Sequence, residues 1–162
     1  MSDRIRILIV DDEVKFLESI AKRLELRGLD VTTASNGEQA LEIARKERFD
    51  LALLDLKMPG VDGREVLKVL KEEHRFLEVI ILTGHGSVDS AVECTKLGAF
   101  DYLPKPYELD NLLDVLNEAY QARLRNKFES DQDRLEKIAQ IALGNSPLAI
   151  LRELRRIDDD KK

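Results

Sequence analysis

The chain has 162 residues, of which 43% are apolar and 36% charged, with 8 Gly and 4 Pro, so collagen-like, low-complexity and wholly disordered proteins are excluded. No apolar run approaches the roughly 18 residues of a membrane span, and no secretory signal opens the chain, so we expect a soluble, cytoplasmic protein without membrane contact. The net charge of −6 argues against direct nucleic-acid binding. The single cysteine, Cys94, cannot form an internal disulfide and is interpreted as a buried filler.

In chain order, short continuous runs of apolar residues alternate with segments in which apolar residues recur every three or four positions. The runs at 5–10, 51–54 and 79–82 are rich in branched residues and predict central strands of a parallel sheet, with weaker strands at 30–34 and 100–103. The repeats predict helices over 14–24, 38–48, 64–74, 87–97 and 108–123. Five strand-then-helix units predict an α/β fold built on a five-stranded, doubly wound parallel sheet.

Acidic residues stand where the first and third predicted strands end. Asp11 and Asp12 follow the first strand and Asp55 follows the third, and ligands bind at this edge of such sheets. Neighbouring carboxylates repel by about 4 kcal/mol per pair at ~4 Å and an effective dielectric near ~20, so we expect a hard cation such as Mg²⁺. The alternative is that Asp11 and Asp12 only cap the helix that begins near Val14.

Thr83 and Lys105 follow the fourth and fifth predicted strands at the same edge. A hydroxyl and a positive charge are what a phosphoryl group on Asp55 would need, with the Asp55 carboxylate as nucleophile. Taken singly, Thr83 is better interpreted as an ordinary strand-end residue and Lys105 as a solvated loop charge, and only their joint placement favours the phosphoryl site. A cis bond between Lys105 and Pro106 would direct the ammonium inward.

Four ordered segments carry a resemblance to a known family. They are Val10-Asp11-Asp12-Glu13, residues 54–63 (LDLKMPGVDG), residues 82–86 (LTGHG) and residues 98–106 (GAFDYLPKP). Over residues 4–122 the chain resembles the receiver domain of two-component response regulators, which has a flavodoxin-like fold.

The resemblance implies a role for each matching residue. Asp55 would accept a phosphoryl group from a sensor histidine kinase or a phosphotransfer protein, and the protein would catalyse its own phosphorylation and dephosphorylation. The Mg²⁺ ligands would be Asp11, Asp12, Asp55 and the backbone carbonyl of Lys57. Thr83 and Lys105 would contact the phosphoryl oxygens, and Tyr102 would move inward as Thr83 moves, which remodels a protein-interaction surface.

Two variable positions of the family, here Lys57 and His85, would tune the lifetime of the phosphoryl group. The alternative is that these side chains are only solvated. His74 stands near the end of a predicted helix and is interpreted as completing that end.

Three other functional classes compete with this interpretation. A haloacid-dehalogenase-type hydrolase requires a second Asp two residues after Asp55, where this chain has Lys57. A flavodoxin-like cofactor binder requires a Ser, Thr and Gly-rich loop where this chain has acidic residues 11–13. The complete set of acidic residues, threonine and lysine argues against a pseudo-receiver that binds proteins without being phosphorylated, and a phosphorylation assay decides between the two.

Beyond the predicted receiver domain (1–123), residues 124–162 have nine basic and eight acidic side chains and no strand pattern. We expect a C-terminal helical extension, and we recognise no DNA-binding or ATPase output domain in it. One stripe (Leu124, Phe128, Leu135, Ile138, Ala142) continues the last receiver helix as far as Gly144 and Asn145, and a second (Leu148, Leu151, Leu154, Ile157) follows an N-cap at Ser146 and Pro147. We expect a second copy of the chain or a partner protein to cover the second stripe. The alternative is an unstructured linker.

Overall fold

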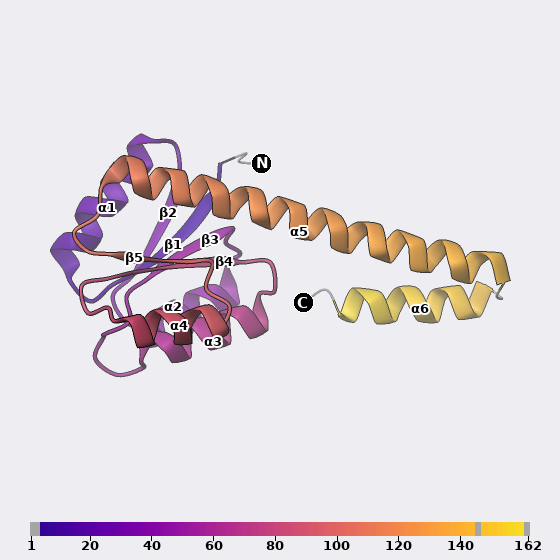
Figure 1. Cartoon of the computed structure of the whole chain (residues 1–162). Coiled ribbons are helices and arrows are strands. Elements are labelled where there is room, and N and C mark those ends of the chain that lie inside the picture. The colour runs from indigo at the N-terminus through magenta and orange to yellow at the C-terminus, as the bar shows by residue number, and fades with distance from the viewer. Residues whose placement is uncertain (1–3, 145–146, 161–162) are drawn as a thin grey trace.

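The computed structural model describes residues 4–144 and 147–160, in which strands and helices alternate along the chain. The elements are β1 (Arg6–Val10), α1 (Val14–Leu26), β2 (Asp30–Ala34), α2 (Gly37–Lys46), β3 (Leu51–Leu54), α3 (Gly63–Glu73), β4 (Glu78–Thr83), α4 (Val88–Lys96), β5 (Asp101–Pro104), α5 (Leu109–Gly144) and α6 (Pro147–Asp159). The five strands form one parallel sheet in the order β2-β1-β3-β4-β5, with helices on both faces (Figure 1). The predicted fold class is confirmed.

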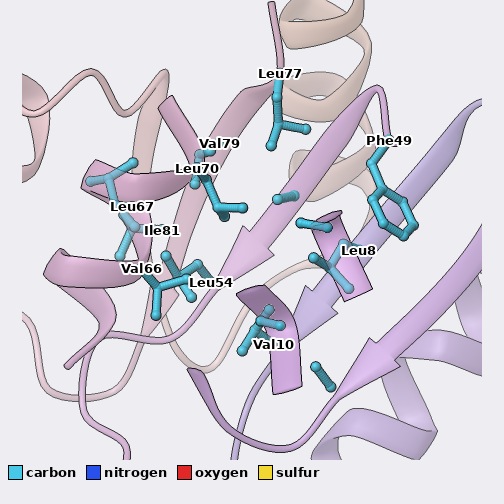
Figure 2. Packing of buried hydrophobic residues seen from close by; sticks show 14 of the residues in the cluster. Leu8, Val10, Phe49, Leu54, Val66, Leu67, Leu70, Leu77, Val79 and Ile81 are labelled. Carbon is cyan, nitrogen blue, oxygen red and sulfur yellow. The ribbon is translucent and has the colours of Figure 1, made fainter. Parts of the chain in front are cut away.

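Alternate residues of the central strands supply two separate apolar cores. On one face, Leu8 and Val10 of β1 pack with residues of α2, α3 and α4, and Figure 2 shows part of this cluster. On the other face, Ile7 and Ile9 pack with residues of α1 and α5. Because β1, β3 and β4 are buried on both faces, their sequences are continuous apolar runs, which is why they were recognisable. Cys94 is fully buried in the first core as a free thiol, as predicted.

The predicted bounds agree with the structure to within one or two residues. The helix predicted over 108–123 continues without interruption to Gly144 as α5, as the first apolar stripe of the extension predicted. Arg123 therefore lies inside a helix, and no break in secondary structure marks the expected domain boundary. Among the described residues, no helix has both the length and the apolar composition to cross a bilayer.

The second apolar stripe lies on α6, which folds back beside the outer half of α5 (Figure 1). Pro147 begins α6 as predicted, whereas Asn145 and the predicted N-cap Ser146 lie outside the described residues. The expectation that another molecule must cover the whole stripe is wrong for Ile157, which is only 8% exposed within a single chain. Leu148 and Leu151 remain 59% and 61% exposed. The contact between α6 and α5 of the same chain is what covers Ile157.

The start of α3 approaches the end of β3 so closely that only glycine fits. A Cβ placed on Gly63 would lie 2.3 Å from the backbone oxygen of Asp55 and 2.6 Å from the Cα of Leu56. The Gly63 N–H also donates to the Leu56 carbonyl at 3.0 Å. This contact holds the loop that follows Asp55 against the sheet.

We predict that Gly63→Ala destabilises the protein by about 1–3 kcal/mol, because backbone atoms must move to admit the methyl group. Urea unfolding followed by circular dichroism measures the change. Gly84→Ala is the control, since a Cβ there makes its nearest contact at 3.8 Å. Equal midpoints for the two variants would contradict the prediction.

Candidate functional site

Parallel pairing of β1 with β3 brings two buried carboxylates to the same edge of the sheet. Val10 pairs with Leu54, so Asp11 and Asp55 follow neighbouring strands. Both are only 2% exposed, and the Asp55 N–H donates to the Val10 carbonyl at 3.0 Å. The exposed Asp12 contributes a third carboxylate, and one oxygen from each of the three lies within 4.8 Å of the others. The structure thus brings together all three predicted acidic residues.

Helix capping does not account for these aspartates. The N-cap residue of α1 is Glu13, and no side chain caps that helix end. Asp11 Oδ1 instead accepts a hydrogen bond from the Glu13 N–H at 2.9 Å, which orients the carboxylate within its own loop.

Lys105 supplies the positive charge among the carboxylates. Its Nζ lies 2.5 Å from Asp11 Oδ2 and 3.4 Å from Asp55 Oδ2, and its side chain is 12% exposed. The Lys105 N–H donates to the Thr83 carbonyl at 3.0 Å, and the Lys105–Pro106 peptide bond is cis, the isomer that the sequence analysis considered. The predicted inward direction of the ammonium is therefore present.

Two contacts of the Lys105 ammonium were missed from the sequence. Glu13 Oε1 lies 3.7 Å from Nζ, and the Phe16 ring centroid lies 4.1 Å from it. Glu13 is the N-cap residue of α1, and Phe16 lies in the first turn of that helix. A negative carboxylate and the negative face of an aromatic ring both stabilise a cation, so α1 helps to hold the ammonium in place.

The pKa values of Asp11 and Lys105 are both raised, but for different reasons. Burial raises the pKa of the Asp11 carboxyl, and the hydrogen bonds from Lys105 and the Glu13 N–H only partly oppose it. Burial also works against the charged Lys105, but the hydrogen bond to Asp11 and the surrounding carboxylates outweigh it and raise the pKa of the ammonium. A further positive charge beside Asp11 would therefore stabilise the ionised form of its carboxyl group.

Asp55 carries a polar atom that the protein leaves unsatisfied. Its Oδ1 is buried without a hydrogen-bond partner among the described residues. An orphaned oxygen beside two further carboxylates suits a hard cation, which prefers carboxylate oxygens. The residues present therefore fit Mg²⁺, held by Asp11, Asp12 and Asp55. The Lys57 side chain is exposed two residues beyond Asp55, as expected for a residue whose only predicted metal contact is its carbonyl.

The hydroxyl of Thr83 lies at the end of β4, and Thr83 is 1% exposed. Its Oγ1 accepts a hydrogen bond from the His85 N–H at 3.1 Å, while the His85 side chain is exposed. A cavity of about 400 Å³ lies next to Thr83 and is also lined by Lys105 and Tyr102. Thr83 and Tyr102 thus face one space, although they come from different strands.

Ser90 is a second residue that sequence reasoning missed. Its hydroxyl lies 2.7 Å from the Tyr102 hydroxyl, and the residue is buried. Ser90 also completes a reciprocal capping box with Ser87 at the start of α4. The Ser-x-x-Ser spacing at a helix start was the available signal for the cap, but no local pattern connects Ser90 with Tyr102.

The comparisons with known proteins identify the same region of the chain. Residues 7–117 match the family described as response regulator receiver domain. The chain is 39% identical over 113 residues to the DNA-binding transcriptional regulator NtrC of Escherichia coli K12, which covers 70% of this chain and 24% of that protein. It is similar to a CheY-like receiver domain structure from Methanospirillum hungatei (TM-score 0.74, 31% identity, 76% of this chain and 99% of that one).

The similarity to a longer solved protein also includes part of the extension. NtrX from Brucella abortus matches with a TM-score of 0.75 and 31% identity, over 81% of this chain and 30% of that one. The chain spans about a quarter of the length of the curated relatives that it matches.

We predict that Lys105→Met lowers the free energy of unfolding by about 3–5 kcal/mol in EDTA, because it leaves two buried carboxylates without their counter-ion. Urea titration with and without Mg²⁺ measures this, and Mg²⁺ should recover part of the loss. Lys96→Met, at an exposed lysine of α4, is the control and should change stability by less than about 0.5 kcal/mol. A Lys105→Met loss no larger than the control's would contradict the role given to Lys105.

Proposed function

The chain belongs to the response regulator receiver family, and from that premise we propose that it is a Mg²⁺-dependent phosphoacceptor that is switched by phosphorylation of Asp55. Receiver domains in general interact with histidine kinases or phosphotransfer proteins, and we propose such a protein as the phosphodonor here. The observation that carries the proposal is the Asp55 carboxylate, which is buried, faces the Lys105 ammonium and has one oxygen without a partner among residues 4–144 and 147–160. Such an oxygen is free to act as a nucleophile.

In the proposed reaction, an Asp55 oxygen attacks the phosphorus of a phosphohistidine, a P–O bond forms and the P–N bond breaks. Mg²⁺ would supply charge neutralisation for the transferred group. Lys105 provides a second positive charge that its ion pairs with Asp11 and Asp55 keep in place, and the Thr83 hydroxyl offers a hydrogen bond to a phosphoryl oxygen. Hydrolysis of the aspartyl phosphate by water would reset the protein, with Lys57 and His85 at the entrance as the residues that tune its lifetime.

The switch would use the space between Thr83 and Tyr102. Movement of the Thr83 hydroxyl toward a phosphoryl oxygen changes the walls of the 400 Å³ cavity that both residues line. The Tyr102 hydroxyl is tied to Ser90, so a response of Tyr102 reaches the start of α4. Two conformations of this element, biased by phosphoryl contacts, would alter a protein-binding surface.

The output of the extension would be protein association. We assign residues 1–123 to the receiver and residues 124–162 to an extension that mediates contact with a second copy of the chain. Exposed apolar side chains on α5 and α6, including Phe128, Leu148 and Leu151, support this assignment. Burying each would contribute roughly 1.5–3 kcal/mol before entropic costs.

We predict that acetyl phosphate with Mg²⁺ labels Asp55 only, because Asp55 Oδ1 has no hydrogen-bond partner among the described residues, whereas the two oxygens of Asp11 accept from the Glu13 N–H and from Lys105. Intact-protein mass spectrometry of wild type and Asp55→Asn measures labelling, which should be abolished in the variant. Asp110→Asn, at an exposed acid in the first turn of α5, is the control. Absence of label in the wild type would favour the pseudo-receiver, and label persisting in Asp55→Asn would exclude Asp55 as the acceptor.

We predict that Thr83→Ala still accepts the phosphoryl group but that phosphorylation then changes the surroundings of Tyr102 only weakly. The reason is that the variant lacks the hydroxyl that would contact the phosphoryl oxygen. Amide chemical shifts around Tyr102 and Ser90 on addition of beryllofluoride should shrink to less than about half of the wild-type change. Thr95→Ala, whose hydroxyl bonds within α4, should respond like the wild type. Shifts of wild-type size in Thr83→Ala would reject the coupling.

We predict that truncation after Arg123 leaves phosphorylation intact and lowers the oligomeric mass measured by light scattering. The double variant Leu148→Glu/Leu151→Glu should have the same effect in the full chain, because it places charge on the exposed face of α6. Lys22→Glu, at an exposed lysine of α1, is the surface control. If truncated and full-length proteins have the same mass with and without beryllofluoride, the extension is not the association element.

A further inference from the structure

A cavity of about 420 Å³ lies at the end of the sheet opposite Asp55. Its walls come from the loop before β3, the loop between α3 and β4, the middle of α5 and the end of α6. Phe49 and Leu77, which line it, precede β3 and β4, whereas Asp55 follows β3. The volume lies within the range of small-molecule sites, and neither phosphorylation nor the Tyr102 switch uses this cavity.

The charges around the cavity do not cancel. Of its lining residues, Arg123 pairs with Asp50 at 2.9 Å and Asp158 pairs with Arg134 at 3.4 Å. The remaining charged side chains on the wall are Arg48, Arg75, Lys127 and Glu73, and the described part of the chain gives none of them an ion pair. The wall therefore keeps three positive charges against one negative charge, in a chain whose net charge is −6.

A buried polar atom of the same wall also lacks a partner. His74 Nε2 is withdrawn from solvent and forms no hydrogen bond with any described residue. His74 is the C-cap residue of α3, and its backbone N–H donates to the Leu70 carbonyl at 2.8 Å. The backbone N–H of His74 thus completes this helix end, whereas Nε2 lies behind the cavity wall, withdrawn from solvent. Buried nitrogens without partners are rare in folded proteins.

An apolar surface adjoins these cations. Phe49 and Phe76 both line the cavity, and the Arg75 guanidinium lies 5.1 Å from the centroid of the Phe76 ring. In such a pair the guanidinium supplies hydrogen-bond donors, and the aromatic ring supplies an apolar face. A ligand with both a charged group and a flat organic part matches this wall.

We propose that this cavity binds a small organic anion that carries a phosphate monoester and is about the size of a mononucleotide. A phosphate monoester has a charge of about −1.5 to −2 near neutral pH and three acceptor oxygens, which complements the excess positive charge of the wall. Arginine side chains bind phosphate through paired N–H donors. The phenyl rings would contact the organic part of the ligand.

Binding at this place would be linked to the position of α6. Asp158 stands on the wall of the cavity at the end of α6 and pairs with Arg134 of α5. A bound anion repels the Asp158 carboxylate, so the ligand and the docked end of α6 oppose one another. By reciprocity, weaker docking of that end strengthens ligand binding.

The test is calorimetric titration of the full-length protein with adenosine monophosphate and, separately, with inorganic phosphate. Both titrations contain EDTA and no Mg²⁺, which keeps the Asp55 site without its metal. We expect saturable binding of one adenosine monophosphate per chain, with the amide shifts of His74 and Arg75 among the largest. Asp55→Asn should bind equally well, which separates this proposal from the proposed phosphorylation.

Three variants identify the site. Arg48→Gln/Lys127→Gln should weaken binding by about tenfold or more, because it removes two charge-assisted contacts. Asp158→Asn should strengthen binding by about two- to fivefold, because it removes a nearby negative charge. Lys22→Gln, at an exposed lysine of α1, should bind like the wild type.

Three outcomes would overturn the proposal. The first is the absence of saturable binding of adenosine monophosphate. The second is an unchanged affinity in Arg48→Gln/Lys127→Gln. The third is an affinity for inorganic phosphate as high as that for the nucleotide, which would exclude a contribution from the phenyl rings and hence the organic anion.

Discussion

The ammonium of Lys105 between Asp11 and Asp55 is the contact on which the functional edge of the sheet depends. Two carboxylates that are each 2% exposed cannot remain charged side by side unless a cation offsets their repulsion. The two acids follow β1 and β3, whereas Lys105 follows β5, so one ion-paired group joins the centre of the sheet to its edge strand. Loops that belong to separate strand–helix units are thereby held in one site.

Much of this arrangement could be predicted because its determinants are local. The runs at β1, β3 and β4 are buried on both faces, and that alone makes them continuous apolar segments. Parallel strands bring their carboxyl ends to one edge, so the order of residues along the chain was enough to gather Asp11, Asp55, Thr83 and Lys105.

The contacts that escaped prediction all join residues from different elements without a repeating pattern. Phe16 lies beneath the Lys105 ammonium and Ser90 binds the Tyr102 hydroxyl, and neither pairing has a characteristic spacing. The prediction that another molecule covers Ile157 was wrong for a related reason. A stripe of apolar residues at helical spacing predicts that one face of a helix is buried, but it does not show which surface covers that face.

The uninterrupted course of α5 gives the molecule a mechanical property. Its first turns pack on the sheet with Leu112 and Leu116, and the same helix continues past Arg123 to Gly144 (Figure 1). At 1.5 Å per residue the outer part is a lever arm of about 30 Å, so a tilt of about 5° at the sheet displaces the far end by about 3 Å. Sub-ångström rearrangements beside β5 are in this way enlarged to displacements comparable with the width of a methyl group at the distant hairpin.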